Sequence, residues 1–159
     1  MCGIAAIVNF KRPLNHESAR IKNMIQSVKH RGPDADQFIV KENALLGHTR
    51  LAIIDVEKGC QPMSKMFEGI EYTIVYNGML YNYEDLRKEL HQLGFQFSTD
   101  SDTEVLLTAY IAWKEKCLNR FNGIFAFVIY SNQEIFVARD QMGVKPLYYV
   151  LKADGEWMF

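Results

Sequence analysis

The run Gly123 to Tyr130, Gly-Ile-Phe-Ala-Phe-Val-Ile-Tyr, is almost wholly apolar and constrains the fold more than any other segment. A short apolar run of this kind, followed by a polar turn, is typical of a β-strand that is buried on both faces. Such a strand must be covered by another sheet on one face and by helices on the other. Gly3 to Phe10 is also short, apolar and uncharged, so we expect a four-layer αββα sandwich.

Further strand and turn signals indicate two antiparallel sheets. Strands are expected over residues 38–40, 44–54, 71–76, 134–139, 147–151 and 156–159. Asp154-Gly155 and Asn77-Gly78 are both hairpin signals, and frequent hairpins favour antiparallel pairing and an α+β class. Residues 59–66 are expected to form a loop.

Three helices are expected on the outer faces of these sheets. The first spans residues 17–30 with Asn15 as its N-cap, and the second runs from an Asn82 cap to Gly94. The third begins at Ser101, where Glu104 would complete a capping box. Its expected apolar stripe comprises Val105, Leu106, Ala109, Tyr110 and Trp113.

The composition fits a single domain, residues 1–159, and excludes several classes of function. With 18 basic and 19 acidic residues the net charge is −1, so the positive excess that a phosphate backbone requires is missing and no nucleic-acid partner is expected. No apolar run approaches the ~18 residues of a membrane span, and the N-terminus lacks a signal-peptide pattern. Three widely spaced cysteines favour neither a disulfide framework nor a zinc site, so we expect a cytoplasmic protein without a metal in this domain.

Cys2 is the residue with the clearest potential for chemistry. Removal of Met1 would make it the N-terminal residue, which then owns both a thiol and a free α-amine. The reference pKa values of these groups, about 8.5 and about 7.7–8.0, are close enough for the amine to act as the base. A buried cysteine at the start of a strand would explain the same position without any catalytic role.

Three more positions each allow a structural and a functional interpretation. Asn77-Gly78 is a hairpin signal, but an exposed turn can also place a backbone N–H beside an asparagine amide as an oxyanion hole. Arg50, in a mainly apolar strand, fits either a structural ion pair or a clamp on a substrate carboxylate. Asp102 fits either the dipole of the third helix or a substrate ammonium group. The histidines show no metal-ligand spacing.

Taken in order, the motifs resemble one family along essentially the whole chain. They are Met-Cys-Gly-Ile, His30-Arg-Gly-Pro-Asp34, Gly47-His-Thr-Arg-Leu-Ala-Ile-Ile-Asp55, Gln61-Pro-Met63, Tyr76-Asn-Gly78, Tyr81-Asn-Tyr83, Ser101-Asp-Thr-Glu104, Phe121-Asn-Gly-Ile-Phe-Ala-Phe127, Ala138-Arg-Asp140 and Gly143-Val-Lys-Pro-Leu-Tyr-Tyr149. This set resembles the class II glutamine amidotransferase domain of glutamine-hydrolysing asparagine synthetases. The resemblance implies the N-terminal nucleophile hydrolase fold and the hydrolysis of L-glutamine to glutamate and ammonia.

The resemblance also implies a role for each candidate residue. Cys2 is the nucleophile, its α-amine is the base, and Asn77 with Gly78 forms the oxyanion hole. Arg50 holds the α-carboxylate of glutamine and Asp102 its α-ammonium. The family usually has a glutamate after the Asn-Gly pair that also meets this ammonium, whereas this chain has Met79.

The acceptor of the ammonia is expected to lie in another domain. No Ser-Gly-Gly-x-Asp-Ser pyrophosphate loop is present, so ATP and Mg²⁺ are expected only in a C-terminal synthetase domain of a longer protein. A homodimer is compatible with the resemblance. Glucosamine-6-phosphate synthase and phosphoribosyl-pyrophosphate amidotransferase typically have Arg-Gly-Tyr-Asp and Arg-Gly-Gln-Asp where this chain has Arg31-Gly-Pro-Asp34. A domain serving such another acceptor, or a non-catalytic regulatory module favoured by Met79, remains an alternative.

Overall fold

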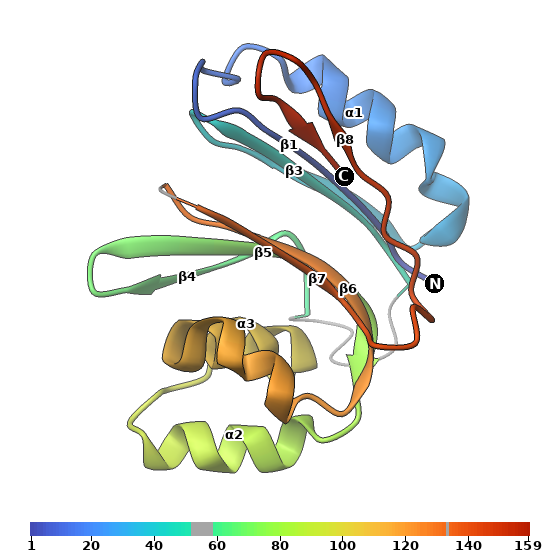
Figure 1. Cartoon of the computed structure of the whole chain (residues 1–159). Coiled ribbons are helices and arrows are strands. Elements are labelled where there is room, and N and C mark those ends of the chain that lie inside the picture. Colours follow the sequence, from blue (N-terminus) through green and yellow to red (C-terminus); the bar gives the residue numbers. More distant parts are fainter. Residues whose placement is uncertain (52–58, 133) are drawn as a thin grey trace.

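The computed structural model describes residues 1–51, 59–132 and 134–159, and these form the expected α+β sandwich of two antiparallel sheets (Figure 1). The strands are β1 (Gly3–Val8), β2 (Ala35–Val40), β3 (Ala44–Arg50), β4 (Met63–Phe67), β5 (Ile70–Leu80), β6 (Gly123–Tyr130), β7 (Ile135–Arg139), β8 (Val150–Leu151) and β9 (Trp157–Met158). The helices are α1 (Ser18–Ser27), α2 (Tyr83–Gln92) and α3 (Asp102–Trp113), with short 3₁₀ helices at Lys29–Arg31 and Lys114–Arg120.

The layers follow the order that the doubly apolar strands predict. One sheet has the strand order β2-β3-β1-β9-β8 and the other β4-β5-β6-β7. Figure 1 shows α1 on the outer face of the first sheet and α3 on the outer face of the second, with α2 beyond α3. The inner faces of the two sheets meet through small and β-branched side chains, among them Ala6, Val8, Val75 and Val128.

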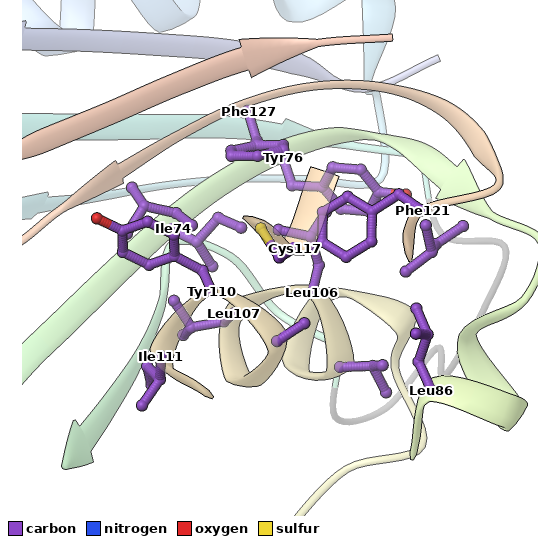
Figure 2. Packing of buried hydrophobic residues seen from close by; sticks show 14 of the residues in the cluster. Ile74, Tyr76, Leu86, Leu106, Leu107, Tyr110, Ile111, Cys117, Phe121 and Phe127 are labelled. Atoms are coloured by element: carbon purple, nitrogen blue, oxygen red, sulfur yellow. The ribbon is translucent and has the colours of Figure 1, made fainter. Parts of the chain in front are cut away.

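β6 shows why its sequence is apolar throughout. Phe125 and Phe127 belong to the cluster that packs between the second sheet and α3 (Figure 2). Val128 and Tyr130 alternate with them and belong to the cluster between the two sheets. Both faces of the strand are therefore buried. A strand with alternating apolar and polar residues would instead leave its polar face exposed to solvent.

α3 is more deeply buried than the predicted apolar stripe indicates. Every residue from Asp102 to Ile111 is buried, because the sheet covers one side of the helix and α2 packs on the other. The predicted capping box is only half right. Ser101 Oγ accepts the Thr103 N–H, but Glu104 accepts the N–H groups of Ser98 and Thr99 rather than that of Ser101. Among the described residues, no helix is long and apolar enough to cross a bilayer.

β5 contains the main correction to the sequence prediction. No turn forms at Asn77-Gly78: the strand continues to Leu80, and Asn77 pairs with Ala126 of β6. Glycine is required there because a Cβ on Gly78 would lie 2.3 Å from the Ile124 carbonyl oxygen. The predicted Asp154-Gly155 hairpin does form, between β8 and β9.

Smaller differences concern caps and boundaries. The residue before α1 is Glu17, so Asn15 does not cap that helix, and Asn82 precedes α2 without a side-chain cap. β4 occupies part of the predicted loop at 59–66 because it pairs with the first half of β5. The end of the strand predicted over 44–54 lies outside the described residues.

A buried carboxylate joins the C-terminal hairpin to α1. Glu156 is fully buried and accepts hydrogen bonds from Arg12 at 2.7 Å, from Arg20 at 2.8 and 2.5 Å, and from Lys152 at 2.8 Å. The hydrogen bonds from Arg20 lead the causes that lower the pKa of Glu156 to about 2. The charged form is therefore the one that the fold stabilises.

We predict that Glu156→Gln lowers the free energy of unfolding by about 2 kcal/mol at pH 7, because three cations lose their shared partner. The folded pKa lies below the ordinary value of 4.5, so the contribution of Glu156 is complete above about pH 4.5 and is lost as the pH falls toward 2. Urea unfolding curves should converge for wild type and variant over that interval. Glu89→Gln, which breaks a half-exposed pair with Arg120, should cost less than about 0.5 kcal/mol. Equal losses in the two variants would contradict this assignment.

Candidate active site

A cavity of about 170 Å³ brings together the residues that the sequence singled out: Cys2, Arg50, Asn77, Gly78 and Asp102 all line it. They arrive from different elements. Cys2 precedes β1, Arg50 ends β3, the Asn-Gly pair lies in β5, and Asp102 begins α3. The pairing of β1 with β3 places Gly3 opposite Thr49, which brings the start of one strand beside the end of the other.

The thiol of Cys2 is held at the cavity wall by backbone groups. The Leu51 N–H lies 3.4 Å from Sγ, and Sγ lies 3.6 Å from the Leu51 carbonyl oxygen. The Gly3 N–H donates to Thr49 Oγ1 at 3.0 Å, which fixes the first residue of β1 against β3. The nucleophile candidate is therefore positioned by the strand that also carries Arg50.

The His30–Asp34 motif holds the backbones of Cys2 and Arg50 in place. Arg31 Nε donates to the Cys2 carbonyl oxygen at 3.1 Å, and the Asp34 N–H donates to the Arg50 carbonyl oxygen at 3.0 Å. A Cβ on Gly32 would lie 2.3 Å from the Thr49 carbonyl carbon, so only glycine permits this close approach. The motif thus clamps both Cys2 and Arg50 through their backbones, a role that sequence reasoning did not assign.

β5 presents a free backbone edge to the cavity, because β4 does not extend alongside this part of the strand. On this edge the Tyr76 N–H donates to Gln61 Oε1 at 2.6 Å and the Leu80 N–H donates to Asp102 Oδ2 at 3.1 Å. N–H groups alternate along an antiparallel strand, so the Gly78 N–H faces the same edge between them. This is the geometry of an oxyanion donor built from a strand, not from a turn.

Two opposite charges are buried in the same cavity. Arg50 is 8% exposed and Asp102 is 5% exposed. The Tyr76 hydroxyl donates to Asp102 Oδ2 at 2.9 Å, and burial raises the pKa of Asp102 although its hydrogen bonds oppose this. Arg50 Nη1 lies 3.7 Å from Cys60 Sγ. The cavity therefore suits a ligand that carries both an anionic and a cationic group.

Gln61 and Lys145 line the cavity, although the sequence analysis gave neither of them a role. Gln61 Nε2 donates to Thr103 Oγ1 at 3.2 Å, so this side chain bridges β5 and the start of α3. The motif Gln61-Pro-Met63 was the only sequence signal for it. Lys145 comes from the Gly143–Tyr149 motif and places its ammonium 3.3 Å from Met1 Sδ.

His48 also lines the cavity, and its hydrogen bond connects the two sheets. Its Nε2 lies 3.2 Å from the Tyr76 carbonyl oxygen, so it joins β3 of one sheet to β5 of the other. Burial lowers the pKa of His48 to about 4. The imidazole is therefore neutral at physiological pH and holds the two sheets together as a hydrogen-bonding group.

Comparison with known proteins finds one matching family model and relatives that share one name. A family model described as a glutamine amidotransferase domain matches residues 1–159. Asparagine synthetase (glutamine-hydrolyzing) 3 of Bacillus subtilis (strain 168) is 48% identical over 161 residues, which cover 100% of this chain and 26% of that protein. Asparagine synthetase B (glutamine-hydrolyzing) of Escherichia coli (strain K12) is 33% identical over 158 residues, covering 98% and 28%. The chain thus spans about a quarter of the length of these curated relatives.

A solved structure supports the fold independently. Glutamine phosphoribosylpyrophosphate amidotransferase from B. subtilis, complexed with ADP and GMP, aligns with a TM-score of 0.80 at 21% sequence identity. The alignment covers 99% of this chain and 41% of that chain. At this identity the likeness concerns the fold alone, which the two proteins share over nearly all of the present chain.

We predict that His48→Gln removes a pH dependence of stability between about pH 4 and 6.5. The folded pKa of about 4 lies below the ordinary 6.5, so the unfolded chain takes up the proton first. Wild type should therefore lose up to about 3 kcal/mol of unfolding free energy as the pH falls through this window. Denaturant titrations at several pH values measure it. The exposed His16→Gln should keep the wild-type slope, and an unchanged slope in His48→Gln would contradict the burial argument.

Proposed function

The chain belongs to the glutamine amidotransferase domain family, and we propose that it hydrolyses L-glutamine to glutamate and ammonia with Cys2 as the nucleophile. The observation that carries the proposal is the shared cavity. It joins the Cys2 thiol, the open edge of β5 at Gly78, and the opposite charges of Arg50 and Asp102.

Glutamine has an amino-acid end that complements the two charged residues and a side-chain amide that complements Cys2. Its α-carboxylate pairs with Arg50 and its α-ammonium with Asp102, which leaves the side-chain amide free to reach Cys2. The Tyr76 hydroxyl and the Leu80 N–H hold the Asp102 carboxylate in place. These contacts bind a part of the substrate that does not react, so they act as positioning contacts for the amide.

The reaction follows from the groups around the amide. After Met1 is removed, the α-amine of Cys2 accepts the thiol proton and the thiolate attacks the amide carbon. The oxyanion that forms accepts hydrogen bonds from the Gly78 N–H and from the side-chain amide of Asn77. The protonated α-amine of Cys2 then returns its proton to the amide nitrogen, and the C–N bond breaks. Ammonia departs, and a glutamyl thioester remains on Cys2. Water then adds with the amine as base, releasing glutamate and restoring the thiol.

We also propose that the ammonia serves a synthetase domain elsewhere in a longer protein, which aminates aspartate with ATP and Mg²⁺. The names and lengths of the relatives support this. So does an exposed apolar surface on the segment after β7, where Met142 is 87%, Tyr148 82% and Tyr149 66% exposed. Exposed apolar groups gathered in one segment are typical of a surface that contacts another domain or chain.

We predict that Cys2→Ala lowers glutamine hydrolysis by about 10⁴-fold or more, since no other group replaces the nucleophile. Cys117→Ala should stay near wild type, because burial raises the pKa of that thiol to about 12 and it lies in the core. A coupled glutamate assay on protein with Met1 removed, verified by intact mass, measures both. Full activity with Met1 retained would refute the α-amine as base.

We predict that Met79→Glu lowers KM for glutamine by roughly ten- to a hundredfold with little change in kcat. Met79 lines the cavity with Asp102, and a charge-assisted hydrogen bond to the substrate ammonium is worth about 1.5–3 kcal/mol. The ammonium is remote from the reacting amide, so the gain falls on binding. Saturation curves provide the measurement.

Two controls separate charge from shape at this position. Met79→Gln has a similar size without the charge and should leave KM nearly unchanged, as should Met66→Glu on exposed β4. An unchanged or higher KM in Met79→Glu would mean that the ammonium lies elsewhere. If wild type hydrolyses no glutamine and Met79→Glu does not restore it, the non-catalytic regulatory module becomes the better interpretation.

A further inference from the structure

Gln61 is a buried amide that lies between two parts of the proposed catalytic site. The residue is 7% exposed and lines the same cavity as Gly78 and Asp102. Its Oε1 accepts the N–H of Tyr76 at 2.6 Å, and its Nε2 donates to Thr103 Oγ1 at 3.2 Å. One side chain therefore connects β5 with the first turn of α3.

The contact with Tyr76 extends the pairing of β4 with β5 by one hydrogen bond. The first paired residue of β4 is Met63, which lies opposite Ile74, and continuing this register by two residues places Gln61 opposite Tyr76. In a longer β4, a backbone carbonyl at this position would accept the Tyr76 N–H. Here the side-chain carbonyl of Gln61 accepts it instead.

This contact leaves one proposed oxyanion donor on the open edge of β5. The N–H groups of Tyr76, Gly78 and Leu80 face this edge, because N–H groups alternate along an antiparallel strand. Gln61 accepts the first of them, and Asp102 Oδ2 accepts the third at 3.1 Å. The Gly78 N–H therefore lies between two backbone groups that side chains hold in place.

The contact with Thr103 fixes the start of α3 relative to that donor. Thr103 is 3% exposed, and its N–H donates to the Ser101 side chain, so it belongs to the capped first turn of the helix. It directly follows Asp102 in the sequence. Because Gln61 holds Tyr76 at one end and Thr103 at the other, it constrains the distance between the edge of β5 and the Asp102 carboxylate.

We propose that Gln61 is a positioning residue that aligns the oxyanion donor of the site with the residue that holds the substrate ammonium. It acts on the Gly78 N–H through Tyr76 and on Asp102 through Thr103. The inference rests on the proposed function. A short carbon chain joins the two ends of glutamine, so the distance between the two binding groups has to match the length of the substrate.

A neutral bridge has an advantage over the charged one beside it. Asp102 also joins α3 to β5, through the Tyr76 hydroxyl at 2.9 Å and the Leu80 N–H, but its carboxylate is the group that the substrate ammonium would share. The amide of Gln61 carries no charge and bonds to groups that glutamine does not need. Its two hydrogen bonds therefore persist while glutamine binds and its products leave.

Steady-state kinetics on mature, Met1-free protein separates the two contacts. Gln61→Met keeps the size of the side chain but loses both hydrogen bonds. The value of kcat should fall by roughly ten- to a hundredfold, because the oxyanion donor is misplaced, and KM should rise. Thr103→Val loses only the contact with α3, so KM should rise about threefold or more while kcat stays within about twofold of wild type.

Two further variants test whether the hydrogen bonds cause these effects. Gln61→Glu retains an oxygen for the Tyr76 N–H and a second one for the Thr103 hydroxyl, so it should recover most of kcat. Ser64→Ala is the matched control, because it removes a side-chain hydrogen bond between β4 and Thr73, at 2.8 Å, outside the cavity lining. It should leave kcat and KM near wild type.

Amide hydrogen exchange provides a readout that needs no glutamine. In Gln61→Met the N–H groups of Tyr76 and Leu80 should both exchange about tenfold faster than in wild type, whereas Ser64→Ala should leave them unchanged. Leu80 reports on the contact between β5 and Asp102, which a purely local role of Gln61 would not affect.

Three results would overturn the proposal: an unchanged kcat in Gln61→Met, an equal loss of kcat in Gln61→Glu, or faster exchange at Tyr76 without any change at Leu80. A rise in KM alone in Gln61→Met would mean that Gln61 affects only binding. If the wild type hydrolyses no glutamine, the proposed function fails, and the exchange of the Leu80 N–H still decides whether Gln61 aligns β5 with α3.

Discussion

Strand β5 continues beyond the end of its neighbour β4, and the backbone groups on that edge must find other partners. Gln61 supplies one and Asp102 another, which ties the loop before β4 and the start of α3 to this strand. Between them the Gly78 N–H faces the cavity. Because β4 ends before β5 does, the exposed edge of β5 provides an N–H donor for an oxyanion. The same edge binds Gln61 and Asp102 on either side of that donor.

The same region concentrates buried charge that a purely structural core would avoid. Arg50, Asp102 and Lys145 are all buried at one end of the sandwich, whereas the sheet interface and the α3 cluster are apolar. Charges taken out of water cost stability unless they are paired or meet a ligand. Stability is supplied by the apolar packing on both faces of β6 and by the Glu156 network that joins the C-terminal hairpin to α1.

Sequence reasoning succeeded where a local pattern has only one physical solution. Doubly apolar strands need cover on both faces, so the αββα layering followed from β6 and β1. It failed where two solutions share a pattern. Asn77-Gly78 is a hairpin signal, yet the glycine serves the close passage of β6 and the strand continues. The stripe on α3 was too narrow because α2 covers the face that was expected to be exposed.

The sequence by itself indicated the layers, one candidate nucleophile and two oppositely charged candidate residues, because these depend on residue type and order. Only the tertiary structure decided how they act together. The β1–β3 register places Cys2 beside Arg50, and the missing extension of β4 opens the edge at Gly78. The place of Lys145 in the cavity was also invisible in sequence, since only the folded chain brings it and Cys2 together.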